Sequence, residues 1–230
     1  MPITGMPEVQ PGDVIADLLV AAAIAGGTPV EAGDCVVVTQ KIVSKAENRL
    51  VPLPVDDLDA RRALIESEAV RVLRRRGELL ITETRHGFVC ANAGIDVSNV
   101  DAGVAALLPV DGDRSAKRIR DALRAVHGLE VAVIVTDTFG RAWRRGLTDV
   151  AIGVSGLAGV ADLRGGTDAN GRVLQVTEVA IADEVAGAAE LVMGKAESVP
   201  VALVRGLDPG WFREASVDEL IRPYAEDLFR

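Results

Sequence analysis

The sequence predicts one domain, residues 1–230, that mixes helices and strands (α+β). Short β-branched runs are interspersed with longer segments whose apolar residues keep helical spacing. Aromatic residues make up only 3% of the chain while Ala, Val, Leu and Gly are abundant, which is typical of helices packed on sheets. Hydrophobic residues make up 49%, enough for a sizeable core in a chain of 230 residues.

The net charge of −9 limits the classes of partner. An acidic protein has no long-range attraction to a phosphate polymer or an anionic membrane, so we expect neither nucleic acid nor membrane as a partner. Any anionic ligand must be held by local clusters of Lys and Arg. The two cysteines, Cys35 and Cys90, each adjoin an apolar stretch, which favours buried free thiols and a cytoplasmic location.

The first predicted element is a helix over residues 14–25, which are alanine-rich and apolar and are followed by the helix-ending "GGTP". The β-branched run that comes next predicts a strand over 35–39. A loop or turn is expected at the end of this strand, where ligands often bind. It contains Gln40, Lys41, Ser44 and Lys45.

A second helix is predicted over residues 57–76, because acidic residues come early, basic residues come late, and Gly77 follows. The basic triplet Arg74, Arg75 and Arg76 is then a solvated helix end. The segment "ELLITET" (78–84) predicts a strand, and "FVCANAGIDVSNV" (88–100) predicts a strand that ends in a polar loop.

A third helix is predicted to begin at an N-cap, Asp113 or Ser115, and to end at His127 before Gly128. The helix dipole favours a surface histidine at that end. The apolar run "VAVIVT" then predicts a central strand that is covered on both faces, with Asp137 just past its end.

The last third of the chain begins with its most loop-like segment, residues 156–171. The segment "LQVTEVA" (174–180) predicts a strand. Asp183 is the predicted N-cap of a helix over 183–195, and "VPVALVRG" (199–206) predicts the final strand.

The chain lacks the common sequence signatures of phosphate loops, dinucleotide folds, zinc sites and nucleophile elbows, and it contains only two histidines. Carboxylate and hydroxyl chemistry remains. Asp96 and Asp137, each in a polar loop beside hydroxyl residues, suit Mg²⁺ or Mn²⁺, which in turn bind nucleotide phosphates. The alternative is structural: Asp96 forms an Asx-turn and Asp137 caps a helix.

Two basic clusters allow similar alternatives. Arg141, Arg144 and Arg145 crowd one loop after Asp137, where they either bind carboxylate or phosphate groups or are solvated or paired at an interface. Lys41 and Lys45, four residues apart, either reach phosphates or decorate a helix face.

Six blocks together resemble the coenzyme F420 γ-glutamyl ligase family, in the same order along nearly the whole chain. They are "GMPEV", "GDCVVVTQKIVSKAENRLV", "NAGIDVSNV", "VIVTDTFGRAWRRG", "ADEVAGAAELVMGK" and "VPVALVRG". The resemblance implies a GTP-dependent ligase that joins L-glutamate to the deazaflavin precursor F420-0 and then extends a γ-linked tail. It also implies two interlocked subdomains and an intertwined homodimer. Actinobacterial relatives fuse this module to a reductase domain, which we do not expect here.

The resemblance also implies the ligands and their residues. GTP is the co-substrate, two Mg²⁺ or Mn²⁺ ions bind per site, and K⁺ is a candidate additional ion. The resemblance assigns the binding of these cations to Asp96, Asp137 and Thr138. The nucleotide falls to Met6, Pro7, Glu8, Val9, Gln40, Lys41, Lys45, Asn99, Met193, Gly194, Lys195, Ala196, Glu197, Ser198 and Val199. Arg141, Arg144 and Arg145 are expected at the anionic tail or the glutamate carboxylates.

The chain departs from the family pattern at Lys195, where archaeal members have a metal-binding Glu. An ammonium has only donors and cannot ligate a cation. Either Glu197 takes over as the ligand, which we favour, or Lys195 pairs with phosphate and one metal is lost.

Two other classes of function use the same residues. A metal-dependent nucleotide phosphohydrolase would release phosphate whether or not glutamate is present. A non-catalytic nucleotide-binding module would bind without turnover.

Overall fold

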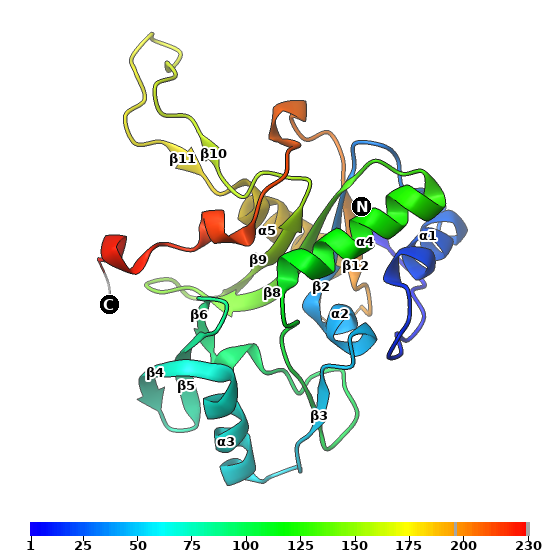
Figure 1. Ribbon diagram of the computed structural model, residues 1–230, viewed down its shortest axis with the longest axis vertical. Helices are drawn as coiled ribbons and strands as arrows, with labels where there is room; N and C mark the ends of the chain where they lie inside the picture. Colours follow the sequence, from blue (N-terminus) through cyan, green and yellow to red (C-terminus); the bar gives the residue numbers. More distant parts are fainter. Residues whose placement is uncertain (196, 229–230) are drawn as a thin grey trace.

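A five-stranded sheet forms the centre of the computed structural model, which describes residues 1–195 and 197–228 (Figure 1). The strand order is β1-β12-β2-β8-β9, with β2 and β8 parallel and the other neighbours antiparallel. The strands are β1 (Pro2–Ile3), β12 (Val201–Val204), β2 (Cys35–Thr39), β8 (Ala132–Gly140) and β9 (Leu147–Ser155).

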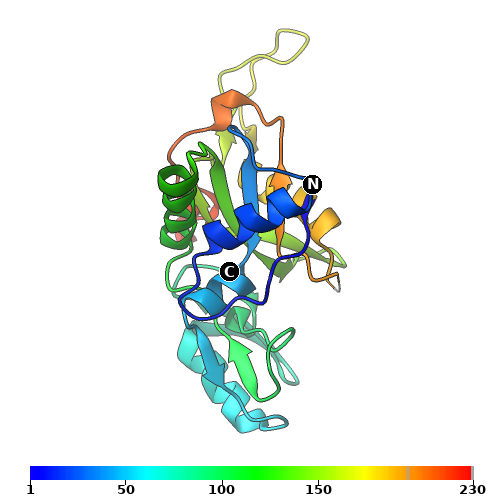
Figure 2. The same cartoon turned by 90° about the vertical axis from the view of Figure 1, so that its right-hand side faces the viewer.

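Helices cover both faces of this sheet (Figure 2). They are α1 (Ile15–Ala25), α2 (Gln40–Ala46), α4 (Gly112–His127) and α5 (Ile181–Met193). Alternation along the strands divides the core: on β8, Val133 and Val135 pack with α1 and α4, whereas Ala132 and Ile134 pack with α5. The predicted central strand with two covered faces is therefore confirmed. Cys35 and Cys90 are both buried free thiols, as expected.

A smaller lobe hangs below the central sheet in Figure 1. It consists of β3 (Leu50–Pro52) paired with β7 (Val104–Ala106), the hairpin sheet of β4 (Ala69–Arg76), β5 (Leu79–Thr84) and β6 (Val89–Ala91), helix α3 (Leu58–Glu68), and a 3-10 turn, η1 (Asn92–Gly94). Its own core is small and centres on Ile65, Leu80 and Ala93.

A long hairpin projects from the opposite end of the molecule (Figure 1). Only its base pairs as strands, β10 (Ala161–Asp162) with β11 (Glu178–Val179). The chain then returns through α5 and β12 to three 3-10 turns, η2 (Pro209–Trp211), η3 (Val217–Leu220) and η4 (Tyr224–Glu226). In the described part of the chain, each helix is too short or too polar to cross a lipid bilayer.

The predicted helix over 57–76 is wrong in its second half. Helix α3 ends at Glu68, and residues 69–76 form β4, which pairs with β5. Gly77 has φ of +59° and lies in the two-residue turn between these strands. A positive φ suits both a helix C′ position and a tight hairpin, so the glycine did not distinguish them. The arginine triplet is thus on an exposed strand, where Arg75 pairs with Glu66.

The predicted N-caps, Asp113 or Ser115 for one helix and Asp183 for the other, are also wrong, and the two aspartates share one reason. Helix α4 is capped by Asp111, whose side chain accepts from the Arg114 N–H, and α5 begins after Ala180 without a side-chain cap. Asp113 instead accepts from the Val154 N–H and Asp183 from the Ala151 N–H. Strand β9 is an edge strand of the sheet, and these carboxylates satisfy its otherwise open donors.

The remaining predictions differ in detail. Residues 40–46 form α2 instead of a loop, and the expected strand over 174–180 is reduced to Glu178–Val179. Strand β8 continues to Gly140, so Asp137 lies within it. The predicted strands at 35–39 and 78–84, and the helix end at His127 with Gly128 at φ +68°, are confirmed.

Candidate active site

The parallel pairing of β2 and β8 brings the two candidate segments together. Thr39 is opposite Thr136 in the register, so Gln40 and Lys41 lie beside Asp137 and Thr138 at the same edge of the sheet. Carboxyl ends of parallel strands are a common place for ligand sites. A cavity of about 720 Å³ opens at this edge.

The cavity collects nearly all the residues expected to bind nucleotide and metal. Its lining includes Met6, Pro7, Glu8, Val9, Gln40, Lys41, Lys45, Asp96, Asn99, Asp137, Thr138, Met193, Gly194, Lys195, Ser198 and Val199. Arg141, Arg144, Arg145 and Glu197 do not line it, and Ala196 lies outside the described residues. The three arginines are exposed at the tip of the β8–β9 hairpin, where Arg141 donates to the Arg145 carbonyl (2.8 Å).

Asp96 enters the cavity from the polar loop after β6. Its Oδ1 accepts from the Ser98 N–H at 2.7 Å, which is the Asx-turn that the sequence left open. Its Oδ2 lies 2.8 Å from Lys41 Nζ, which also donates to the Ser98 hydroxyl. Burial disfavours the charged carboxylate, but these contacts outweigh it and lower the pKa of Asp96.

Asp137 is the carboxylate in the cavity whose surroundings most disfavour its charged form. Burial raises its pKa to about 7, and repulsion from Asp96 and Asp149 acts in the same direction, against the Thr138 N–H and Lys41. A carboxylate in this position gains from an additional positive charge nearby.

Sequence reasoning missed Asp149 and Glu190, which form a second acidic pair beside Asp137. Asp149 is only 3% exposed and faces Thr138 across the β8–β9 hairpin. Glu190, on α5, accepts from the Asp149 N–H at 2.9 Å. Lys195 Nζ bridges them, 2.9 Å from Asp149 Oδ1 and 2.7 Å from Glu190 Oε1. A hairpin interpretation of "TDTFGRAWRRGLTDV" could have found Asp149, since it places "TDT" opposite "TDV".

Two further sets of polar contacts lie in the cavity wall. Lys45 is buried and pairs with Glu8 from the N-terminal loop. Ser44 Oγ lies 2.8 Å from Gln40 Oε1 and 2.6 Å from the Leu107 carbonyl, although one hydroxyl hydrogen serves only one acceptor. Gln40 Nε2 is buried without a described partner. Turning the amide over resolves this conflict, because Nε2 then donates to Ser44, which donates to Leu107.

The donor set fits a divalent cation that is shared with a substrate. No three carboxylate, histidine or cysteine side chains within residues 1–195 and 197–228 form a complete metal site. Mg²⁺, however, is usually held by one or two carboxylates together with substrate phosphates. Asp96 and Asp137, two carboxylates that repel each other across the cavity, match that requirement.

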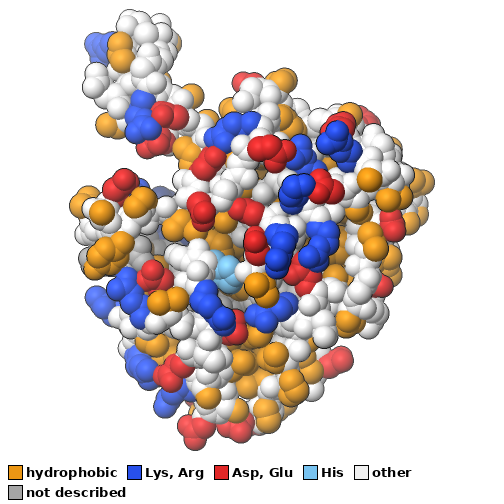
Figure 3. All heavy atoms as spheres, in the orientation of Figure 1, with side chains coloured by type: hydrophobic (Ala, Val, Ile, Leu, Met, Phe, Trp, Pro, Cys, Tyr) orange, Lys and Arg blue, Asp and Glu red, His pale blue; other side chains and the backbone are white. Residues whose placement is uncertain are grey.

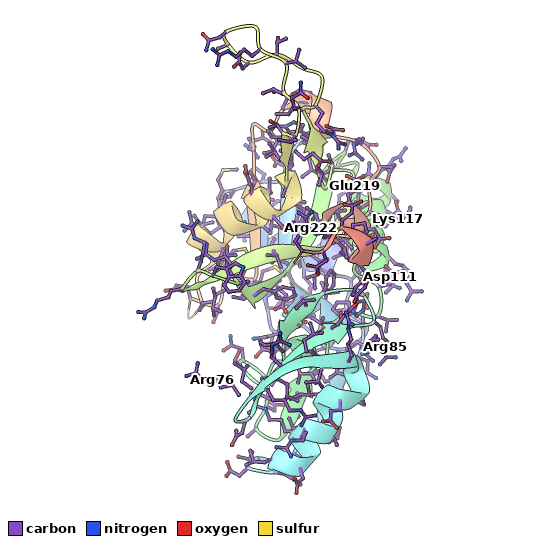
Figure 4. The ribbon with its side chains drawn as sticks, turned by 90° about the vertical axis from the view of Figure 1, so that its left-hand side faces the viewer. Arg76, Arg85, Asp111, Lys117, Glu219 and Arg222 are labelled. Carbon is purple, nitrogen blue, oxygen red and sulfur yellow. The ribbon has the colours of Figure 1, made fainter. Side chains whose placement is uncertain are left out.

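A second cavity, of about 470 Å³, lies at the start of α4 and suits a charged ligand less well. Asp111 and Lys117, labelled in Figure 4, both line it. Figure 3 shows acidic and basic side chains interspersed over this face. Asp113, also in its lining, is already bound by the Val154 and Val217 N–H groups. The sheet-edge cavity is the candidate active site because it contains nearly all the residues that the sequence singled out.

Fold and site together define an α+β protein with an acidic, lysine-balanced pocket at the carboxyl ends of two parallel strands. Residues 4–206 match the family described as F420-0:Gamma-glutamyl ligase. The chain belongs to this family.

Curated relatives agree over nearly the full length. The chain is 45% identical to a protein of Methanothermobacter thermautotrophicus over 244 residues, covering 99% of this chain and 97% of the relative. It is 41% identical to one of Methanopyrus kandleri, covering 97% and 94%, and 39% identical to one of Methanocaldococcus jannaschii, covering 88% and 86%. Each relative is named coenzyme F420:L-glutamate ligase. The family resemblance of the sequence blocks is thus confirmed.

Proposed function

We propose that this protein is a GTP-dependent ligase that joins L-glutamate to the deazaflavin precursor F420-0 and extends a γ-linked glutamate tail. The names of the family and of its full-length relatives support the substrates. One structural observation supports the chemistry most directly: a single cavity contains two repelling carboxylates, Asp96 and Asp137, with two lysines, Lys41 and Lys45. Such a site suits phosphate groups and a divalent cation.

The proposed reaction has two steps. The γ-phosphoryl group of GTP passes to a carboxylate oxygen of the acceptor, giving an acyl phosphate and GDP. The amine nitrogen of glutamate then attacks the acyl carbon, phosphate leaves, and the nitrogen loses a proton to give the amide. Asp96 and Asp137 would hold Mg²⁺ or Mn²⁺, which offsets charge on the phosphoryl oxygens. Lys41 and Lys45 orient phosphates once nucleotide displaces Asp96 and Glu8 from their ammonium groups.

The arginine hairpin is proposed to hold the acceptor. Arg144 and Arg145 are exposed and make no salt bridge with a described residue, and Arg141 stiffens their turn. Leu147, which pairs with Gly140 directly beside the arginine loop, lines the cavity. Guanidinium groups here can pair with glutamate carboxylates that extend outward from the cavity.

The experiment that tests this function is an incubation of the protein with GTP, Mn²⁺, L-glutamate and F420-0, followed by product masses. We expect products heavier by one or more glutamyl units, and GDP release that requires both glutamate and acceptor. Equal phosphate release with and without glutamate would identify a phosphohydrolase. Nucleotide binding without turnover would identify a non-catalytic module.

A further inference from the structure

Three side chains at the cavity edge form an oxygen cradle around one ammonium group. Lys195 Nζ lies 2.6 Å from Thr138 Oγ1, 2.9 Å from Asp149 Oδ1 and 2.7 Å from Glu190 Oε1. An ammonium has three N–H donors, and these three contacts use all of them. Lys195 therefore has no donor left for a phosphate in this arrangement.

The cradle is arranged for a cation. Thr138 Oγ1 also lies 2.6 Å from Asp149 Oδ1, so its hydrogen goes to the carboxylate and its lone pairs face Lys195. The Glu190 carboxylate is fixed from its other side by the Asp149 N–H. Asp149 is 3% exposed and the Glu190 side chain 20% exposed, and two adjacent carboxylates so far removed from water are costly unless a positive charge lies between them.

The backbone delivers Lys195 to this position. Helix α5 ends at the buried Met193, and Gly194 then adopts φ +62° and ψ −173°, a conformation that side-chain-bearing residues rarely adopt. A Cβ atom on Gly194 would also lie 2.1 Å from Glu197 Oε2. The turn brings Lys195 back over Glu190 of the same helix, whereas Glu197 does not line the cavity.

We propose that the Lys195 ammonium is a built-in cation, held by Thr138, Asp149 and Glu190 in place of a second divalent metal. The active site then works with one divalent cation, at Asp96 and Asp137, and one fixed ammonium. The cradle distances suit N–H···O hydrogen bonds and exceed the ~2.0–2.1 Å of Mg²⁺–oxygen bonds. This inference deepens the proposed function and rests on it for the first cation.

The test counts Mn²⁺ ions bound per chain by electron paramagnetic resonance of free Mn²⁺, with saturating GDP and a GDP-only blank. Wild type and Lys195→Arg should bind one ion. Lys195→Met, which keeps chain length but removes the charge, should bind two, because the cradle then offers two carboxylates and a hydroxyl. Adding Glu190→Gln to Lys195→Met should return the count to one.

Two controls separate the cradle from other effects. Lys117→Met removes a lysine that pairs with Asp121 on the surface of α4, and it should leave the count at one. Glu197→Gln should also leave it at one. Thermal melting checks that each variant is folded.

Two ions in wild type, a count in Lys195→Met equal to that of wild type, or loss of an ion in Glu197→Gln would overturn the inference. The count uses neither glutamate nor deazaflavin, so failure of ligation alone would contradict only the proposed function. If wild type binds no ion, the Asp96–Asp137 site is wrong, and the cradle is then supported only by a gain of one ion in Lys195→Met.

Discussion

The Asp137 side chain lies in surroundings that disfavour a negative charge. Its carboxylate is disfavoured by burial and by two acidic neighbours, Asp96 and Asp149, each of which has its own lysine. Asp137 has no lysine at hydrogen-bonding distance among the described residues. A cation bound beside Asp137 would therefore stabilise its carboxylate and lower its pKa.

The raised pKa of Asp137 predicts a pH-dependent stability. Between about pH 4 and the folded pKa of about 7, the folded protein holds a proton that the unfolded chain has lost. The free energy of unfolding therefore falls as pH rises through this window. Without metal, Asp137→Asn should have a higher melting temperature than wild type at pH 8, because the neutral amide removes the cost of a buried charge. The increase should be about 2–4 °C for each kcal/mol of destabilisation removed. The difference between the two proteins should be smaller at pH 5.

The control for this prediction is Asp121→Asn on the exposed face of α4, which should show no such pH dependence. Calorimetry in EDTA measures the difference in melting temperature between Asp137→Asn and wild type. Excess Mn²⁺ should reverse the sign of this difference, since only wild type keeps the carboxylate that is proposed to bind the metal. A decrease in melting temperature that is the same at both pH values would mean that Asp137 is ionised in the folded protein.

Asp96→Asn tests the same cation through turnover. The change keeps the Asx-turn acceptor but removes the charge, and we expect glutamate addition to slow by on the order of 10²-fold or more. Asp101→Asn, in the following exposed loop, is the matched control and should stay near wild type. Near-normal rates for Asp96→Asn at limiting Mn²⁺ would remove Asp96 from the metal site.

At the scale of elements, the β8–β9 hairpin links the site to its surroundings. Asp137, Thr138 and Asp149 face the cavity near the same end of the hairpin as the loop that carries the arginine tip. The free edge of β9 is satisfied by carboxylates from α4 and α5, namely Asp113, Asp183 and Glu190. Glu190 thus fastens a helix to the hairpin and also belongs to the Lys195 cradle.

Removing the charges of the exposed arginine tip should weaken binding of the acceptor without slowing the chemical step. Changing Arg141, Arg144 and Arg145 to Gln should raise KM for the glutamate-bearing acceptor about tenfold or more, because one charge-assisted hydrogen bond is worth about 1.5–3 kcal/mol. The kcat at saturating acceptor should change little, since these residues do not line the cavity.

The matched control is the exposed triplet Arg74, Arg75 and Arg76 on β4, changed in the same way. Figure 4 shows Arg76 on that separate lobe. Steady-state kinetics at two salt concentrations measures both variants. If KM rises equally in the two, general surface charge is responsible, and the tip holds no acceptor.

The sequence predicted elements well where local pattern and tertiary role agree. Residues 35–39 and 131–136 are continuous apolar runs, and both became buried strands. Residues 69–76 were predicted wrongly because their strand depends on pairing with β5, which no local pattern records. Asp149 and Glu190 were missed for a related reason: they meet only across a hairpin and against a helix.

On the scale of the whole molecule, the projecting hairpin is the feature that the isolated chain explains least. Its apolar side chains Leu163, Val173 and Val176 are 42%, 55% and 83% exposed. Figure 1 shows that the loop extends away from both lobes, so no described core covers it. Apolar residues on an extended arm are typical of a contact with another chain.

The last prediction is that the protein is a homodimer in solution and that this arm contributes to the contact, since exposed apolar side chains gain from burial between subunits. Light scattering over a dilution series should give twice the chain mass. Val176→Asp should shift the mass toward the monomer, because dimerisation would bury its charge. Val126→Asp, at a 67% exposed position on α4, should leave it unchanged. A monomeric wild type with full ligase activity would show that one chain suffices and that the arm has another role.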